Sequence, residues 1–354
     1  MAQYEAIGGK SPIGEWTAAQ GAGLVRALGA QAATAGRVFK TYTAFRYAPP
    51  LTAEALVAMH TDGVRRAVAF SQYPQYSCTT TGSSLNHLWR EALRLGLGDA
   101  FEWTVIDRWH NHPVYIAALA RRVALGLAAL PAEVRDTAAI VFSAHSVPSM
   151  IVNRGDPYVP EVAATVDAVM SALRRGVPLG DGTTGGGGEG GAVVHAAANP
   201  HVLAWQSKVG VLPWMGPSTA SVLAGLGKQG VRAVLMVPGA FTSDHIETLY
   251  EIDVEDRHAA TTAGIRHFGR APSLNDEPLL PTAMAALVAD ALAPGAPAAS
   301  PEYGLRCAGC TNDTCRSILN PATPYSRTTL TPGAGEWPTP AVAAALAAAP
   351  GPTP

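Results

Sequence analysis

Short apolar runs rich in β-forming residues alternate with helical segments along most of the chain, and this alternation limits the fold more than any other feature. The expected strands are Val38–Tyr47, Arg66–Phe70, Glu102–Ile106, Ala138–Phe142, Val202–Trp205 and Ala233–Val237. The expected helices between and after them are Leu51–Thr61, Ser83–Leu95, Pro113–Leu130, Pro157–Arg175, Ser218–Leu226 and Thr282–Leu292. Several of the runs are apolar almost throughout, as in strands that helices cover on both faces. The pattern predicts an α/β fold with parallel sheets, in which ligands bind in the loops that follow the strands.

The composition argues against several classes of protein. The chain has 25 Lys and Arg against 27 Asp and Glu, so there is no basic excess to displace counterions from a nucleic acid. No stretch approaches the ~18 uninterrupted apolar residues that cross a bilayer. Four cysteines in 354 residues are too few for a disulfide scaffold, and the first residues lack the pattern of a secretory signal. We therefore expect a soluble or peripheral intracellular protein, long enough for two ordinary domains.

Histidine and carboxylate side chains gather after two of the predicted strands. His145 follows one strand, and the segment after Val237 contains Asp244, His245, Glu247, Glu251 and Glu255. If that segment is helical, its three glutamates recur at every fourth residue and share one face. A solvated acidic face is the ordinary interpretation of such a pattern. Two histidines in equivalent loops beside carboxylates favour proton transfer or a divalent cation instead.

Aromatic residues accompany these loops. Each could simply belong to the core, but together they suit a flat apolar ligand; they are Tyr73, Tyr76, Trp205, Trp214 and Phe241. Polar side chains that could meet anionic substituents of such a ligand are Tyr4, Ser11, Arg46 and Lys208.

The cysteines indicate a metal centre. Cys307, Cys310 and Cys315 form a C-x2-C-x4-C motif, and Cys78 is the only other cysteine. Three clustered thiolates and a fourth from elsewhere would complete an all-thiolate ligand set. The spacing does not distinguish an iron–sulfur cluster from a structural zinc, and buried thiols without a metal are the simplest alternative.

Two segments are expected to lie outside the ordered core. The glycine-rich insert at 180–191 lacks the Gly-Lys-Ser/Thr ending of a phosphate loop and is expected to be flexible. The stretch Pro332–Pro354 is rich in Pro and Ala, and we expect it to be a disordered tail.

Four longer motifs, in order along the chain, resemble the ferrochelatase family. They are YPQYSCTTTGSSLN (Tyr73–Asn86), FSAHSVP with NRGDPY (Phe142–Tyr158), WQSKVGVLPWMGP (Trp205–Pro217) and FTSDHIETLYEIDVE (Phe241–Glu255). The resemblance extends from Gln3 to about Ser317. It implies insertion of Fe2+ into protoporphyrin IX to form protohaem, with release of two protons, as the terminal step of haem synthesis. It also implies a partition of the chain into two Rossmann-like domains with a cleft between them, predicted at 1–122 and 123–293, and a C-terminal extension at 294–354.

The same resemblance implies roles for individual residues. His145 matches the cleft histidine that takes protons from the pyrrole nitrogens, and His245 and Glu247 match the facing pair, assigned to metal delivery or proton handling. Asp244, Glu251 and Glu255 match an acidic path towards the surface. The implied porphyrin pocket comprises Tyr4, Ser11, Arg46, Tyr73, Ser207, Trp214 and Phe241. The implied ligands of a [2Fe–2S] cluster, as in the animal and fungal enzymes, are Cys78, Cys307, Cys310 and Cys315.

The resemblance further implies a homodimer, peripheral membrane association and a place on the matrix side of the mitochondrial inner membrane. One departure is at the start, where the family's first strand and one lip of the pocket would precede Gln3, so we expect an N-terminally truncated form. Lys10 stands where the family commonly has glycine. The alternatives are a related chelatase using another metal or coproporphyrin, an inactive tetrapyrrole- or metal-binding remnant, and a structural-zinc α/β protein.

Overall fold

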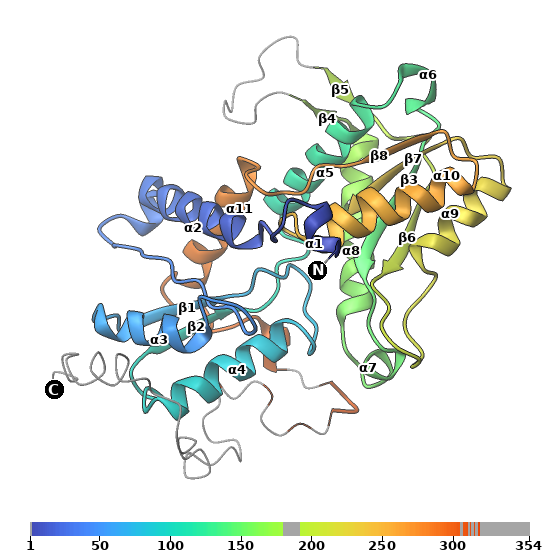
Figure 1. The fold of residues 1–354 in the computed structure, drawn as a ribbon. Helices are drawn as coiled ribbons and strands as arrows, with labels where there is room; N and C mark the ends of the chain where they lie inside the picture. The colour runs from blue at the N-terminus through green and yellow to red at the C-terminus, as the bar shows by residue number, and fades with distance from the viewer. Residues whose placement is uncertain are drawn as a thin grey trace. The chain divides into compact units, whose positions relative to one another are not determined.

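The computed structural model describes residues 2–179, 192–304, 307–310, 312, 315 and 318. The chain forms two compact units, each built from two separate stretches (Figure 1). Unit 1 comprises residues 1–20 and 109–284, and unit 2 comprises residues 21–108 and 285–354. The insert at 180–191 and the stretch Pro332–Pro354 lie outside the described residues, so the expectations for them stay predictions, as do the domain boundaries at 122 and 293.

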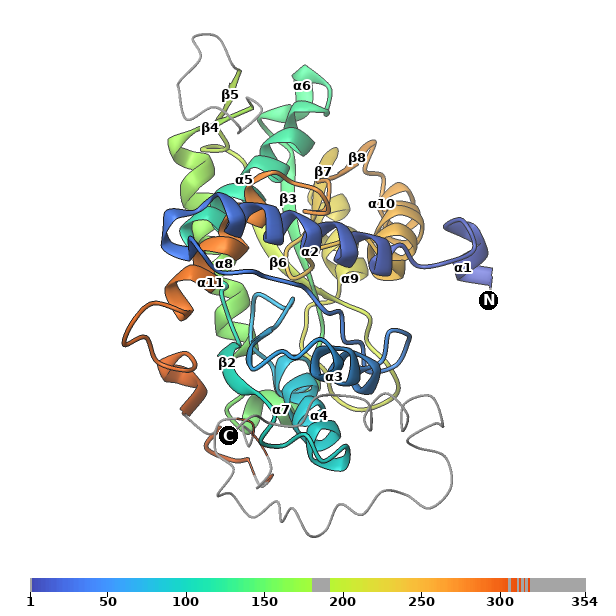
Figure 2. The ribbon, with the colours of Figure 1, turned by 90° about the vertical axis from the view of Figure 1, so that its left-hand side faces the viewer.

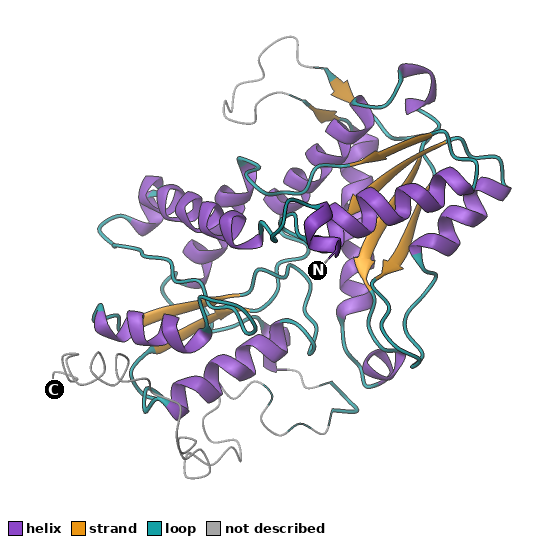
Figure 3. Ribbon diagram, viewed as in Figure 1, coloured by secondary structure: helices purple, strands orange, loops and turns teal. Residues whose placement is uncertain are grey.

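Unit 1 is built on a parallel four-stranded sheet with the strand order β6-β3-β7-β8. The strands are orange in Figure 3. The strands are β6 (His201–Gln206), β3 (Ala139–His145), β7 (Ala233–Pro238) and β8 (His267–Arg270). The two central strands, β3 and β7, are buried along almost their whole length, because helices cover both of their faces.

Two groups of helices cover the faces of this sheet. α5 (Pro113–Ala128) and α8 (Tyr158–Arg175) pack together on one face, while α9 (Thr219–Lys228), η2 (Glu247–Asp256) and α10 (Arg257–Thr262) pack together on the other (Figure 2). η2 is a π-helix that continues directly into α10. The short elements of unit 1 are α1 (Ala2–Ala6), α6 (Ala132–Arg135), α7 (Ser149–Asn153), β4 (Val177–Pro178) and β5 (Val193–Val194).

Unit 2 contains the parallel pair β1 (Arg66–Phe70) and β2 (Glu102–Ile106). Its helices are α3 (Thr52–Thr61) and α4 (Thr81–Arg94), with the short η1 (Ala32–Thr34) and η3 (Pro301–Gly304). Leu56, Tyr76, Trp89 and Trp103 form the centre of its core. Two further helices, α2 (Ile13–Ala30) and α11 (Leu279–Ala291), contain points at which the chain passes from one unit to the other.

The α/β class with parallel sheets is confirmed. The prediction of a strand at Val38–Tyr47 is wrong: within that stretch only Phe45 makes a β-bridge, to Leu51. The stretch is rich in β-branched and aromatic residues, but β-propensity reflects packing on a sheet surface, and Val38 and Tyr47 are exposed. β8 was not predicted because HFGR is short and carries little apolar surface. In the part of the chain that the structure describes, no helix combines the length and apolarity needed to cross a membrane.

Candidate active site

One face of β3 changes from apolar to polar towards the carboxyl end of the strand. Ala139 and Val141 on this face belong to the core under α9, η2 and α10. Ser143 and His145 follow at the same spacing, so their side chains point to the same face. The polar end of β3 therefore lies where ligands bind in a parallel α/β sheet.

His145 is oriented by its own loop. Its Nδ1 lies 2.6 Å from the carbonyl oxygen of Ser146, and because a carbonyl only accepts, Nδ1 carries the hydrogen. The other ring nitrogen, Nε2, faces Glu247 Oε1 at 3.7 Å. When the ring is neutral, Nε2 therefore presents its lone pair, and His145 is set up as a base.

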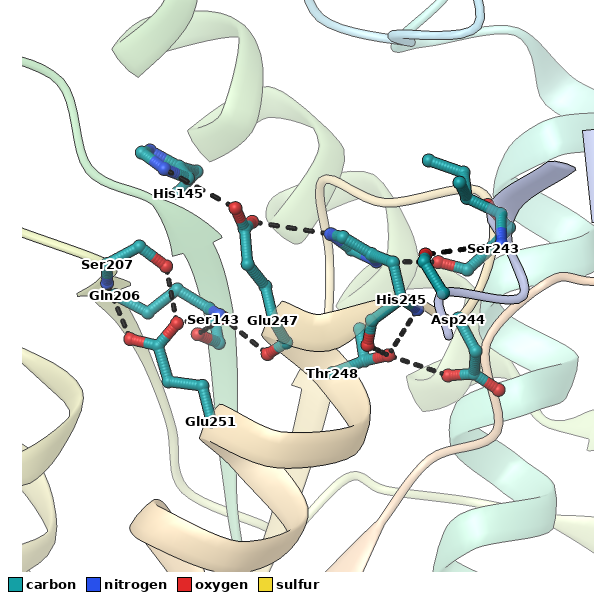
Figure 4. Close-up of polar contacts among 12 residues, drawn as sticks. Ser143, His145, Gln206, Ser207, Ser243, Asp244, His245, Glu247, Thr248 and Glu251 are labelled. Carbon is teal, nitrogen blue, oxygen red and sulfur yellow. Dashed lines mark hydrogen bonds and ion pairs between the residues drawn. The ribbon is translucent and has the colours of Figure 1, made fainter. Parts of the chain in front are cut away.

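His245 has the same arrangement on the opposite side of Glu247. Its Nδ1 lies 3.0 Å from the carbonyl oxygen of Ser243, and its Nε2 lies 3.3 Å from Glu247 Oε2. The ring of Phe241 packs against it, with centroids 4.7 Å apart. The carboxylate of Glu247 thus stands between two imidazoles (Figure 4).

The two histidines determine the charge of Glu247. Burial raises the pKa of its carboxyl, but the hydrogen bond from protonated His245 and the charges of protonated His145 and His245 outweigh burial and lower the pKa overall. Glu247 is consequently an anion near neutral pH, and it can stabilise a proton on either imidazole.

Asp244 is saturated with hydrogen-bond donors. Its carboxylate accepts from Arg270 at 3.0 Å and from three neutral side chains, Ser273, Asn275 and Thr248, at 2.7, 2.8 and 2.9 Å. Burial raises its pKa, but Arg270 and these hydrogen bonds lower it by more. The carboxylate therefore stays ionised, with its oxygens occupied by the surrounding protein.

Glu251 is held by the end of β6. Its carboxylate accepts the backbone N–H of Ser207 at 2.7 Å, the Ser207 hydroxyl, and Nε2 of Gln206 at 3.1 Å. Ser207 has a positive φ of 61°, a conformation that is unfavourable for a residue other than glycine, and both of its hydrogen bonds to Glu251 support it. Glu255, four residues on, is exposed.

The expected sharing of one helical face by Glu247, Glu251 and Glu255 was derived for an α-helix. The segment is instead a π-helix, which bonds each residue to the fifth along the chain. Glu247 and Glu251 both contact Gln206, whereas Glu255 points to solvent. π-Helical turns are rare, and they are frequently found at functional sites.

Two predicted pocket residues of unit 1, Trp214 and Phe241, lie beside the row that His145, Glu247 and His245 form. The ring of Trp214 lies 6.5 Å from that of His145. The N-terminal segment that contains Tyr4 and Ser11 borders a pocket of about 320 Å³, whose lining includes Lys10, Trp16 and Asp244. The pocket therefore adjoins Asp244, the residue before His245.

The other two predicted pocket residues belong to unit 2. Arg46 contacts the hydroxyl of Ser83, and its guanidinium stacks over the ring of Tyr47 at 4.8 Å. Tyr73 is exposed, and its backbone N–H donates to Ser71 Oγ at 3.3 Å. Arg46 itself is half-buried.

The four cysteines all belong to unit 2 and are half-buried thiols. A turn closes the first pair, because the N–H of Cys310 donates to the carbonyl oxygen of Cys307 at 2.9 Å. Sγ of Cys315 lies 4.0 Å from the hydroxyl of Tyr76, which is fully buried. The donors have the chemistry of a cluster site, but within the described ranges no three His, Cys, Asp or Glu side chains are placed to hold one metal ion.

Sequence reasoning missed three residues that organise the site: Ser143, Gln206 and Arg270. Ser143 interrupts an apolar strand, and Gln206 ends another, so a polar residue at a strand end was the available signal. Arg270 lies on β8, which was not predicted, and it binds Asp244 and Asp253 at 3.0 and 2.9 Å.

Comparison with known proteins gives a consistent result. The family model described as ferrochelatase matches residues 1–292. A mitochondrial ferrochelatase of Bos taurus is 45% identical over 315 residues, which cover 89% of this chain and 70% of that protein. One of Schizosaccharomyces pombe is 42% identical over 319 residues, 90% of this chain and 69% of that protein. The solved structure of SirB from Bacillus subtilis with Fe3+ has a TM-score of 0.51 at 14% identity, covering 78% of this chain and 90% of that one, and supports the fold alone.

The parallel α/β fold, with polar residues beyond its strands, belongs to the class of folds that this chain shares with SirB. Within that class, the extent and identity of the sequence matches are decisive. The chain belongs to the ferrochelatase family.

Proposed function

We propose that this chain inserts Fe2+ into protoporphyrin IX, forming protohaem and releasing two protons in haem synthesis. Family membership gives the reaction, and it does not favour the alternatives of another chelatase or an inactive remnant. The observation that carries the site assignment is the row in which His145 and His245 flank the carboxylate of Glu247.

His145 is proposed as the base that removes protons from the pyrrole nitrogens. Its Nδ1–H is committed to the carbonyl of Ser146, so the proton must arrive at Nε2, which is the nitrogen that faces Glu247. An anionic Glu247 stabilises the imidazolium that results. A positioned base of this kind contributes about 10² to 10⁴ in rate.

Glu247 and His245 are proposed to move the proton onward. Glu247 can accept a proton from His145, and His245 Nε2 lies on the other side of the same carboxylate at 3.3 Å. The saturated carboxylates of Asp244 and Glu251 hold this row in place in our proposal, although the resemblance places them, with Glu255, on an acidic path.

The macrocycle must change the contact between His145 and Glu247 if it is to lie between them. Facing atoms on either side of a flat ring need about 3.5 Å each, whereas Nε2 and Oε1 are 3.7 Å apart. We propose that binding rotates one of these side chains away, with Trp214, Phe241 and Ser207 forming the wall in unit 1. Tyr4, Ser11, Arg46 and Tyr73 are proposed to meet the remainder of the ring and its propionates.

Cys78, Cys307, Cys310 and Cys315 are proposed to hold a [2Fe–2S] cluster. The support is the thiol donor set, since soft thiolates are the ligands that iron–sulfur clusters use. No step of the reaction is assigned to it. Visible absorption and EPR of protein reconstituted with iron and sulfide test the proposal; Cys310→Ser should lose the iron–sulfur bands, and zinc with no such bands would contradict it.

A mitochondrial location is supported by the relatives, which are named mitochondrial ferrochelatases. We propose the matrix side of the inner membrane, with a homodimer as the resemblance implies. Exposed apolar side chains in the loop after β6 support peripheral membrane contact: Val211 is 99% and Val209 68% exposed. The N–H of Ser149, after β3, donates to the carbonyl of Pro213 and so joins this loop to the segment after β3. Flotation with anionic vesicles tests this contact, and loss of binding is expected for Val211→Glu.

An insertion assay with Fe2+ and protoporphyrin IX tests the function itself. We expect protohaem to form, and faster than the product from coproporphyrin or the product with another divalent metal. Tight porphyrin binding without turnover would instead support the non-catalytic alternative.

A further inference from the structure

Ser143 and Gln206 form a buried polar pair that the proposed reaction does not use. Ser143 is 0% and Gln206 2% exposed, in strands whose other buried residues are largely apolar. Gln206 stands directly opposite His145 in the register of β3 and β6. A polar pair at this depth is costly unless its hydrogen bonds are made, so its contacts are informative.

The contacts fix the orientation of the Gln206 amide. Its Nε2 lies 2.9 Å from the carbonyl oxygen of Glu247 and 3.1 Å from Glu251 Oε2, and both of these groups only accept. The reversed amide would place an oxygen against two acceptors, so Nε2 must face η2. Oε1 then faces Ser143, whose hydroxyl donates to it.

The pair therefore ties η2 to the sheet beside His145 (Figure 4). One amide hydrogen binds the main chain of Glu247, whose carboxylate faces His145. The other binds Glu251, one turn further along the helix. A fully satisfied buried network of this kind specifies one arrangement of its members.

We propose that Gln206, oriented by Ser143, is a positioning residue that holds Glu247 at the level of His145. This inference rests on the proposed function of His145 and Glu247 as the proton-handling pair. Gln206 does not touch the reacting nitrogens in this role; it sets where the carboxylate stands. A displacement of about 1 Å at such a site can cost as much as about 10²-fold in rate.

Gln206→Met tests the proposal with a side chain of similar length and no amide. We expect kcat for protohaem formation to fall about 10-fold to 10²-fold. The acid limb of the pH–kcat profile should also move to higher pH, because Glu247 would lie farther from the histidines that lower its pKa. Gln229→Met, at an exposed position, is the matched control and should retain the profile.

Gln206→Glu separates positioning from simple packing. An ionised carboxylate there keeps the acceptor for Ser143 but repels Glu251 and the carbonyl of Glu247. Its kcat relative to the original chain should recover as the pH falls, because the protonated acid regains one donor. Ser143→Ala should give a smaller loss than Gln206→Met, since both donors of Gln206 remain. If the Gln206 variants lose thermal stability but keep kcat and the pH profile, the positioning role is wrong.

A readout without turnover separates this inference from the proposed function. The carboxyl ¹³C titration of Glu247, assigned by its absence in Glu247→Gln, should shift to higher pH in Gln206→Met. An unchanged titration overturns the inference even if the chain is an active ferrochelatase. A shifted titration in a chain that makes no protohaem supports the positioning role and contradicts the proposed function.

Discussion

The two ends of the π-helix η2 hold carboxyl groups in opposite states. At its start, Glu247 lies between His145 and His245, and its pKa is lowered. At its end, Asp256 is only 4% exposed, and its Oδ2 has no hydrogen-bond partner among the described residues. Burial raises the pKa of Asp256 to about 7; a hydrogen bond from Thr219 opposes the shift, and the charges of Glu251 and Glu255 add to it.

Burial acts in the same direction at both ends, so it is the neighbours that decide the outcome. Histidines compensate the desolvation of Glu247, whereas at Asp256 the hydrogen bond from Thr219 is outweighed by burial and by the charges of two other acids. The acidic segment is therefore not a uniform chain of carboxylates. It provides one acid that stays ionised beside the proposed base, and another that exchanges its proton near neutral pH.

His145→Ala is the strongest test of the environment of Glu247 at the start of η2. It removes the proposed base and one of the two imidazoles beside Glu247, and the expected loss of protohaem formation is up to about 10⁴-fold. Circular dichroism and thermal unfolding should stay close to those of the original chain, because the His145 side chain is partly exposed. Retained turnover would remove His145 from the mechanism.

Asp256→Asn tests the raised pKa of the carboxyl at the end of η2, through the free energy of unfolding. An ordinary Asp loses its proton near pH 4, whereas folded Asp256 holds it until about pH 7. The folded state binds more protons in that window, so stability falls as the pH rises from about 4 to about 7, by about 1.4 kcal/mol per pH unit. The whole window amounts to on the order of 4 kcal/mol.

Asp256→Asn should remove this dependence. The measurement is the difference between the unfolding free energies of the variant and the original chain, from denaturant titrations across pH 4 to 8. We expect the variant to gain steadily relative to the original chain up to about pH 7, with no further gain above it. Asp136→Asn, at an exposed position away from η2, is the control; a pH-independent difference for Asp256→Asn would show that Asp256 has an ordinary pKa.

Glu247→Gln sharpens the comparison by removing the charge between the histidines while keeping the shape of the side chain. We expect kcat to fall about 10²-fold, as for loss of a proton-transfer group. The fall of kcat towards low pH should also flatten, because a group with a lowered pKa loses its charge only as the pH falls through that pKa. Glu133→Gln, at an exposed position on α6, serves as the control. An unaltered pH profile in Glu247→Gln would contradict the role of this carboxylate.

Local sequence patterns predicted the positions of the strands well. The apolar runs located β1 and β2 residue for residue, and β3, β6 and β7 within a few residues, because buried parallel strands carry a nearly continuous apolar pattern. The partners of the acids could not be predicted in this way. Arg270 reaches Asp244 across 26 positions, and Gln206 reaches Glu247 across 41.

The π-helix was beyond local prediction for the same reason. Its segment has the spacing of an α-helix, and Gln206 binds the carbonyl of Glu247 from another strand. Tertiary contacts of this kind override helical propensity. In the sequence, Asp256 cannot be distinguished from the other acids of this segment. Its raised pKa comes mainly from its burial, which depends on the fold.

Asp244→Asn provides the smallest and most specific test, since Asp244 is a third carboxylate in the same segment with yet another environment. It receives Arg270 and three neutral donors, and its pKa is lowered. An amide there turns one acceptor into a donor that faces other donors, so we expect a loss of about 1–3 kcal/mol in the free energy of unfolding. The effect on kcat should be smaller than that of Glu247→Gln, because Asp244 supports the row and does not exchange its proton. A loss of turnover as large as that of Glu247→Gln, in a chain that unfolds normally, would place Asp244 among the proton-transferring groups.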